Sequence, residues 1–276
     1  ILHLFGIFDV LELKSYDYRF TDVRGPLTGW AASDSTYINM GTDVVLLEVD
    51  DEAWRLMPET WPYPRGTVWA KVIRNLAQAG AKVIAFDIQF DAPETKSEYL
   101  HEFANKINSD DLRQLIPRHG DKMFAEAIQE VKAYNTEVII SAKMVNEPNR
   151  QPPQYIAEPV EEIMKAEPET GLINDQLDDD AFSRRYAIFG EMSHQPGRAY
   201  LTLGVKAVKS FLDIPDTTVP QYDPSNHIWN YGDLRIQSYG NSNTFLVNYY
   251  GPASGYKLQT EEDYPAWGTF PRYSLA

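Results

Sequence analysis

Two nearly continuous apolar runs, separated by one amphipathic segment, constrain the fold of this chain more than any other feature. The runs cover residues 43–50 and 81–90, and their weak alternation is typical of central parallel strands that are covered on both faces. Between them, Val68, Ile73 and Leu76 recur at helical spacing with charged residues opposite. A strand, a helix and a second strand in this order predict a right-handed crossover and a parallel pair.

The same pattern continues along the chain. Residues 121–134 predict a further helix, and the apolar run that follows predicts a third strand. We therefore expect an α/β fold with three layers and a mainly parallel central sheet, in which residues 44–50, 82–88 and 137–143 are adjacent buried strands.

Two segments interrupt this alternation. Residues 92–120 combine prolines with polar helix-forming stretches and predict a helical insertion at the rim of the domain. Residues 145–170 contain five prolines and predict a long loop, with a broken helix near residues 160–166. Further strands are expected at residues 185–189, 234–237 and 245–248, with a helix from about residue 199.

Charge and composition exclude several classes of protein. With 40 acidic and 25 basic residues the net charge is −15, so nucleic acid is not an expected partner. The chain has no cysteine and therefore no disulfide or thiolate site. It also has no apolar run long enough to span a bilayer. The apolar residues 1–8 resemble either the last turns of a membrane helix or an amphipathic helix that docks on the core.

Candidate chemistry lies at the expected carboxyl ends of the first two strands. Asp50 and Asp51 follow the first strand and Asp87 ends the second. The carboxyl ends of neighbouring parallel strands border the crevice where ligands bind. Carboxylates that converge there could hold a divalent cation for a metal-dependent hydrolase, which is the alternative to a non-enzymatic function. They could equally cap loops or pair with Arg65.

The segment Trp61-Pro62-Tyr63-Pro64-Arg65 precedes the first expected helix. Its two prolines restrict the backbone and hold two aromatic rings and a guanidinium close to the same crevice. Trp61, Tyr63 and Arg65 are therefore candidate ligand contacts, together with the three aspartates. In the alternative interpretation, Arg65 pairs with Asp50 or Asp87 and Trp61 closes the core.

Other catalytic signals are weak. Asp175 and residues 178–180 place four carboxylates within six positions, which suggests either a Ca²⁺ site or a solvated acidic turn, but the EF-hand spacing is missing. The five histidines show no zinc-binding spacing. The sequence has no nucleophile elbow, phosphate loop or dinucleotide fingerprint. We therefore expect neither a cofactor nor catalytic turnover in this chain.

An ordered set of motifs resembles the second type of the CHASE extracellular sensor domains, found in cyclases and histidine kinases. The motifs are Glu12-Leu-x-x-Tyr16-Asp17-x-Arg19-Phe20, Val49-Asp50-Asp51-Glu52, Trp61-Pro62-Tyr63-Pro64-Arg65, Gly80 to Phe90, Gly171-Leu-Ile-Asn174, Asp180 with Arg184-Arg185, Asn248-Tyr-Tyr-Gly251-Pro252, and Phe270-x-Arg272-Tyr273-Ser274. Members of the family usually carry Asp-Gly before the central arginine, where this chain has Asp180-Ala181.

The resemblance implies a place in the cell and a set of partners. Residues 1–20 would form a juxtamembrane helix, and residues 21–276 an extracytoplasmic sensor domain whose chain returns to the same membrane. The whole receptor would lie in the bacterial inner membrane, with this domain in the periplasm and a cytoplasmic adenylate or guanylate cyclase or kinase as output. Expected partners are a small ligand or a periplasmic protein, the membrane through flanking helices, and a second copy of the chain.

Overall fold

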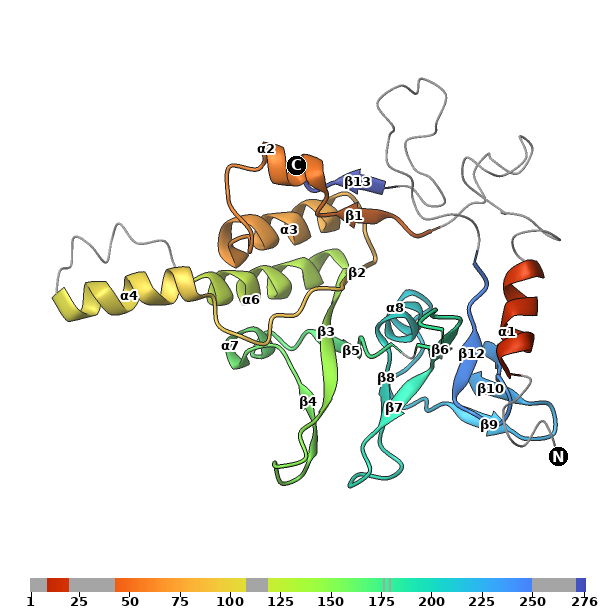
Figure 1. The fold of residues 1–276 in the computed structure, drawn as a ribbon. Helices are drawn as coiled ribbons and strands as arrows, with labels where there is room; N and C mark the ends of the chain where they lie inside the picture. The colour runs from red at the N-terminus through yellow and green to blue at the C-terminus, as the bar shows by residue number, and fades with distance from the viewer. Residues whose placement is uncertain (1–8, 20–42, 108–118, 176, 179, 250–271) are drawn as a thin grey trace, which may run out of the picture. The chain divides into compact units, whose positions relative to one another are not determined.

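The computed structural model describes residues 9–19, 43–107, 119–175, 177–178, 180–249 and 272–276 (Figure 1). The chain divides into two compact units. The larger unit comprises residues 62–177 and 185–246, and the smaller unit comprises residues 1–61, 178–184 and 247–276.

The larger unit is built around one long strand, β3 (Glu137–Asn146). It lies between β2 (Val83–Phe86) and β5 (Glu169–Leu172), and both run parallel to it. The final residues of β3 pair with β4 (Gln154–Ala157) as an antiparallel hairpin. The expected parallel pairing of the second and third strands is therefore confirmed.

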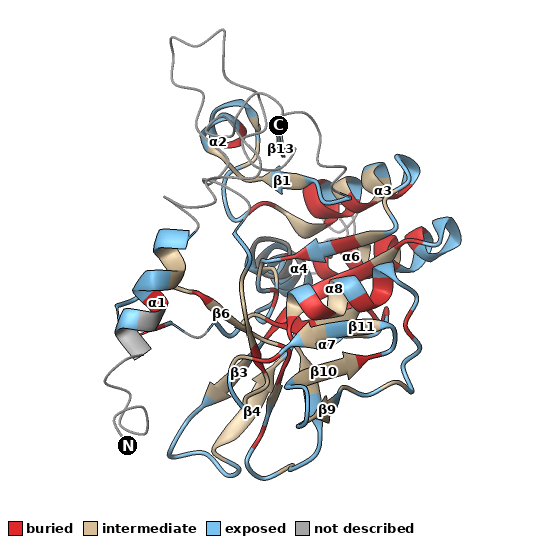
Figure 2. Ribbon diagram, turned by 90° about the vertical axis from the view of Figure 1, so that its right-hand side faces the viewer, coloured by how far each residue is buried: buried red, intermediate tan, exposed pale blue. Residues whose placement is uncertain are grey.

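Helices cover this sheet on both faces. An aromatic cluster of Trp69, Phe86, Phe90 and Phe124 joins β2 to η3 (Arg65–Trp69) and α6 (Gly120–Val131). The helix α3 (Ala70–Gln78) packs beside α6, and α8 (Leu203–Phe211) contacts β2, β3 and β5. Because both faces are covered, residues 138–142 of β3 are all buried (Figure 2). This double coverage explains why the β3 sequence is an unbroken apolar run.

The remaining strands of the larger unit form antiparallel pairs. The strand β6 (Arg185–Ala187) pairs with β12 (Thr244–Leu246), and β7 (Phe189–Glu191) pairs with β8 (Ala199–Leu201). A three-stranded sheet is formed by β9 (Gln221–Asp223), β10 (Ile228–Tyr231) and β11 (Leu234–Gln237). A second core contains Ile188, Phe189, Val205, Ile214 and Tyr231. The larger unit thus has two cores, one within an α/β layer structure and one under short strands.

The smaller unit contains α1 (Asp9–Tyr18), β1 (Leu46–Glu48), α2 (Asp51–Leu56) and β13 (Arg272–Ser274). The strand β1 pairs in parallel with β13, and Leu47 lies opposite Tyr273. Most described side chains of α1 and α2 are exposed, whereas Leu13 and Ala53 are buried (Figure 2). No helix in the described part of the chain is long and apolar enough to cross a membrane.

The expected mainly parallel central sheet is wrong, although the mixed α/β class holds. The sheets are small and mixed, and the first expected strand pairs with β13 instead of lying between buried neighbours. Val44 and Val45 are both more than half exposed. An apolar run indicates a strand, but it cannot show whether its partner lies nearby in sequence or more than 200 residues away, as Arg272 does here.

Three other expectations fall wholly or partly within the described ranges. The insertion at residues 92–120 contains α4 (Thr95–Ile107), and residues 108–118 lie outside the described residues. The expected proline-rich loop contains the strand β4 and a short helix, α7 (Glu161–Met164), which matches the broken helix but not the rest of the loop. The expected helix over residues 1–20 is described only as α1; residues 1–8 and 20 lie outside the described residues.

Candidate functional site

Arg65 forms an ion pair in the larger unit, but its partner is Asp121. The side chain of Asp121 is buried at the start of α6, with the residue only 1% exposed. The Arg65 guanidinium also donates to the carbonyl oxygen of Ala92 at 2.6 Å and lies 5.0 Å from the centre of the Phe90 ring. The expected pairing with Asp50 or Asp87 is therefore replaced by a pair with Asp121. Nothing in the apolar spacing of residues 121–134 marks Asp121 as a partner.

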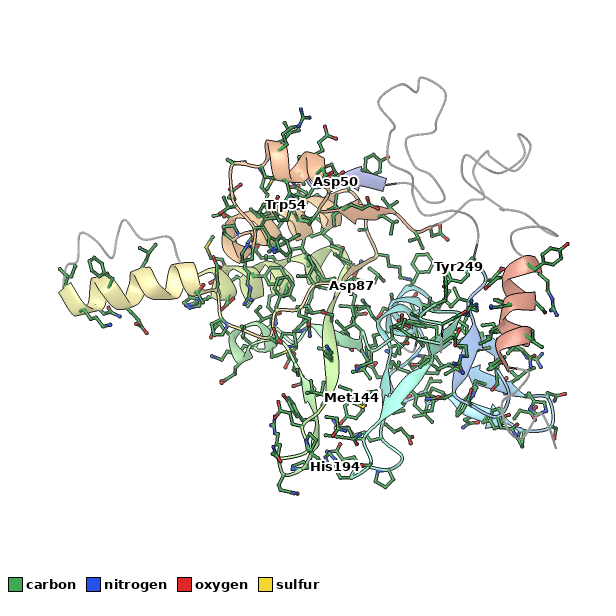
Figure 3. All side chains as sticks on the ribbon, in the orientation of Figure 1. Asp50, Trp54, Asp87, Met144, His194 and Tyr249 are labelled. Carbon is green, nitrogen blue, oxygen red and sulfur yellow. The ribbon has the colours of Figure 1, made fainter. Side chains whose placement is uncertain are left out.

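The remaining members of the expected crevice lie in different surroundings. Tyr63 is buried against Trp69, at 6.1 Å between ring centres, so Tyr63 and not Trp61 closes this part of the core. Asp87 is exposed after the end of β2 (Figure 3). Trp61 is 42% exposed and stacks with Trp54 of α2 at 6.4 Å.

Asp50 has a structural role in the smaller unit. Its Oδ1 atom accepts the backbone N–H of Ala53 at 2.9 Å and therefore caps the N-terminus of α2. The same atom accepts the hydroxyl of Ser274 at 2.7 Å, next to the pairing of β1 with β13. Asp51 is exposed in the first turn of α2. The capping interpretation of Asp50 is thus confirmed.

Glu94 lies beside the Arg65–Asp121 pair. Its Oε2 atom accepts the backbone N–H of Arg65 at 3.2 Å, and its own N–H donates to Asp121 at 3.1 Å. The Glu94 carboxylate also lies against Gly120, where a side chain would collide with it. Burial raises the pKa of Glu94 above its usual value, and the negative charge of Asp121 acts in the same direction.

The raised pKa of Glu94 predicts a stabilising substitution. Because the folded state favours protonated Glu94, its contribution to stability is full below the unfolded pKa and is lost as the pH rises through the folded pKa. Glu94→Gln should therefore raise the melting temperature at about pH 7 and lose this advantage near about pH 4. Thermal melts across this range test the prediction, with exposed Glu158→Gln as the control. A melting temperature that is lower than that of the wild type at neutral pH would contradict it.

A second and larger charge cluster lies in the smaller unit around Arg184. This residue is only 2% exposed. Its guanidinium donates to both carboxylate oxygens of Asp17 at 2.6 Å. It also donates to both oxygens of Asp180, at 2.8 and 2.9 Å, and to Asp178 at 3.1 Å. The hydrogen bonds that Arg184 donates to these carboxylates, those to Asp17 first, raise the pKa of Arg184.

The Arg184 cluster, defined as Arg184 with Asp17, Asp178 and Asp180, joins segments that are far apart in sequence. Asp17 lies on α1, 167 residues before Arg184. Hydrogen bonds beside the cluster tie the same segments together. Tyr16 donates its hydroxyl to the carbonyl oxygen of Val247 at 2.8 Å, and Val247 donates its N–H to the carbonyl oxygen of Arg184 at 2.8 Å. Tyr249 donates to the carbonyl oxygen of Ser183.

Two carboxylates of the predicted acidic segment, those of Asp178 and Asp180, bind Arg184. Asp178 is buried, whereas Asp180 remains exposed. Ala181 adopts a φ angle of 63°, the left-handed conformation that favours glycine. The turn thus keeps the backbone geometry that an Asp-Gly pair would supply. Among the described residues, no three His, Asp or Glu side chains gather in a way that could hold a metal ion.

The larger unit also carries two small pockets. One, of about 230 Å³, is lined by both polar and apolar residues around Lys132 and Glu167. The other, of about 200 Å³, is mostly apolar and lies between two β-hairpins. Sequence patterns do not indicate either pocket, because each is lined by short segments that are brought together by sheet pairing.

The described part of the chain combines a mixed α/β fold with buried ion-pair clusters and small open pockets. The chain matches the CHASE2 domain family over residues 1–276. It belongs to this family, whose members are the sensory extracellular domains of signalling receptors and are not catalytic. Comparison with curated proteins gives no match, and comparison with solved structures gives none either.

Proposed function

We propose that this chain is the periplasmic sensory and signal-relay domain of an inner-membrane receptor whose cytoplasmic output is a nucleotide cyclase or a kinase. The metal-dependent hydrolase is not retained, because Asp50 caps α2 and no observation supports a metal site at Asp50, Asp51 and Asp87. We further propose that the receptor acts as a homodimer. The exposed aromatic side chains of Trp54, Trp61 and Tyr273 support such an interface.

The Arg184 cluster is the single observation that carries the relay role. In the sensor domains that this sequence resembles, the segment that matches Tyr16-Asp17 follows a membrane helix. By this resemblance, α1 would connect the domain to the bilayer. The buried guanidinium of Arg184 donates two charge-assisted hydrogen bonds to the Asp17 carboxylate. These bonds fix the orientation of the carboxylate as well as its distance from Arg184. A ligand or partner that favours one arrangement of the domain would then bias α1 and the membrane helix before it.

Asp17→Asn in the complete receptor tests this role. The substitution weakens the link between α1 and Arg184 but leaves Arg184 with two carboxylates, so the domain should stay folded. We expect the output to change by about fivefold or more. The output is measured in receptor-containing membranes as nucleotide cyclisation and as autophosphorylation.

Two matched variants make the test specific. Asp180→Asn also removes a carboxylate from Arg184, but it lies outside α1 and should change the output less. Exposed Asp233→Asn controls for the loss of one negative charge. Equal outputs from Asp17→Asn and Asp233→Asn receptors, present at equal levels in the membrane, would overturn the relay role of the cluster.

A further inference from the structure

A groove opens between two β-hairpins of the larger unit. One hairpin is formed by β3 and β4 and the other by β7 and β8 (Figure 1). The groove has a volume of about 200 Å³, and Met144, Leu172 and Phe189 contribute to its apolar lining. Met144 belongs to β3, and its methyl group lies 3.0 Å from the position of a Cβ atom on Gly190 of β7, so its side chain faces the other hairpin (Figure 3). An apolar cavity of about 150 Å³ is large enough for benzene, so this groove has the size for a molecule built on one ring.

Some polar groups of the groove are already hydrogen-bonded within the protein. The Asn174 side chain accepts the N–H of Met144 at 2.7 Å and donates to its carbonyl oxygen at 2.9 Å. Thr202 donates its hydroxyl to the carbonyl oxygen of Ala187 at 2.7 Å. Within the described ranges, no hydrogen bond uses the side chain of Asn146 or the Nε2 amide of Gln154, and both residues line the groove. These two amides are therefore available to a ligand.

The two hairpins are also linked to each other. The Oε1 atom of Gln154 on β4 accepts the backbone N–H of Ser193 at 2.7 Å and its hydroxyl at 2.8 Å. Ser193 lies in the turn between β7 and β8. A molecule in the groove would therefore contact two hairpins that are joined by these hydrogen bonds.

We propose that the groove binds one small uncharged molecule with an apolar ring and a hydrogen-bonding substituent. Among the described residues that line the groove, none has a charged side chain, although charged residues make up 24% of the chain. An ionised ligand would lose its hydration without gaining an opposite charge. An uncharged ring can contact Met144 and Leu172 while its substituent reaches the free amides. This site deepens the sensory role proposed above, but binding to it does not require the link between Asp17 and Arg184.

Phenol is a suitable probe, with benzoate and benzylammonium as charged probes that carry the same ring. The complete chain, labelled with ¹³C in its methionine methyl groups, reports binding at Met144. Met123 is the internal reference, because its side chain packs against Gly66, away from the groove lining. Phenol should shift the Met144 signal saturably and leave the Met123 signal in place. Benzoate and benzylammonium should move neither signal.

Gly190→Ala fills the groove from within. A Cβ atom there would lie 2.9 Å from Leu172 Cδ1 and 3.0 Å from Met144 Cε, which are ends of flexible side chains and can yield. Phenol affinity should fall about tenfold or more in this variant. The matched control is Gly204→Ala on α8, where the new Cβ makes an ordinary contact of 3.4 Å with Tyr186. Its phenol affinity should stay within about twofold of the parent.

Ala187→Val narrows the same groove from β6 and gives a second variant, with the same expectation, should Gly190→Ala not fold. Parental phenol affinity in a folded groove-filling variant would overturn the proposal, as would benzoate binding equal to that of phenol. Because this experiment measures binding by the chain itself, it is independent of receptor output. Phenol binding together with an unchanged output of Asp17→Asn would support the groove and overturn the relay.

Discussion

Replacement of Arg184 by methionine should lower the free energy of unfolding by about 3–5 kcal/mol. Methionine keeps much of the length of the side chain but removes its charge. Asp178, whose side chain is 1% exposed, would then lose the guanidinium that it shares with Asp17 and Asp180, and its buried carboxylate would face their negative charges. Urea denaturation followed by circular dichroism measures the loss.

Two companion variants show whether the loss comes from the buried charges. Arg55→Met removes an arginine that is 74% exposed and whose ion pair with Glu52 is 3.8 Å long, so its cost should stay below about 1 kcal/mol. Adding Asp178→Asn to Arg184→Met should recover part of the lost stability, because it removes a buried negative charge that can no longer bind Arg184. A loss for Arg184→Met no larger than that for Arg55→Met would contradict the assigned role of the cluster.

Arg65→Ala should cost a similar amount, about 3–5 kcal/mol, through a different part of the molecule. It leaves the Asp121 carboxylate buried at the start of α6 and removes the hydrogen bond to Ala92 and the contact with Phe90. Thermal and urea denaturation of the variant and its parent measure the effect.

The control for Arg65 is Arg74→Ala on α3. Arg74 pairs with Glu130 at 2.6 Å, but both side chains are partly exposed, and the expected cost is below about 1 kcal/mol. If Arg65→Ala melted at the same temperature as its parent, Arg65 would not be structural. It would then return to the candidates for ligand contact.

Local patterns predicted the parts of the fold that depend on neighbouring segments. The apolar run of β3 indicates a strand that is covered on both faces, and the spacing of α3 indicates a helix with one buried face. A helix that connects two such strands predicts a parallel pair, so the pairing of β2 with β3 could be expected. The pairing of β1 with β13 could not, because its two strands lie more than 200 residues apart. The short strand β4 was missed because prolines surround it and its four residues gain their strand geometry from β3.

In the candidate site, too, the sequence shows individual residues but not contacts between distant segments. The motif residues Asp17, Asp180 and Arg184 are all visible in the sequence, but only the fold shows that one guanidinium binds both aspartates. The spacing of Asp175 and residues 178–180 suggested either a Ca²⁺ site or a solvated acidic turn. An arginine four residues after Asp180 was the available signal for an internal ion pair. The partner of Arg65 gave no comparable signal, since Asp121 lies 56 residues away at the start of an otherwise ordinary helix.

Amide hydrogen exchange of α1 tests most directly the central claim that this helix is fastened to its unit through Arg184. In the wild-type chain, the amides of residues 9–18 should be protected. Asp17→Asn should speed their exchange by about tenfold, which corresponds to about 1.4 kcal/mol, and leave the exchange of β3 unchanged. Asp180→Asn should have a smaller effect on α1. Exchange of α1 at the rate of an unstructured peptide in the wild type, or at the wild-type rate in Asp17→Asn, would contradict the claim.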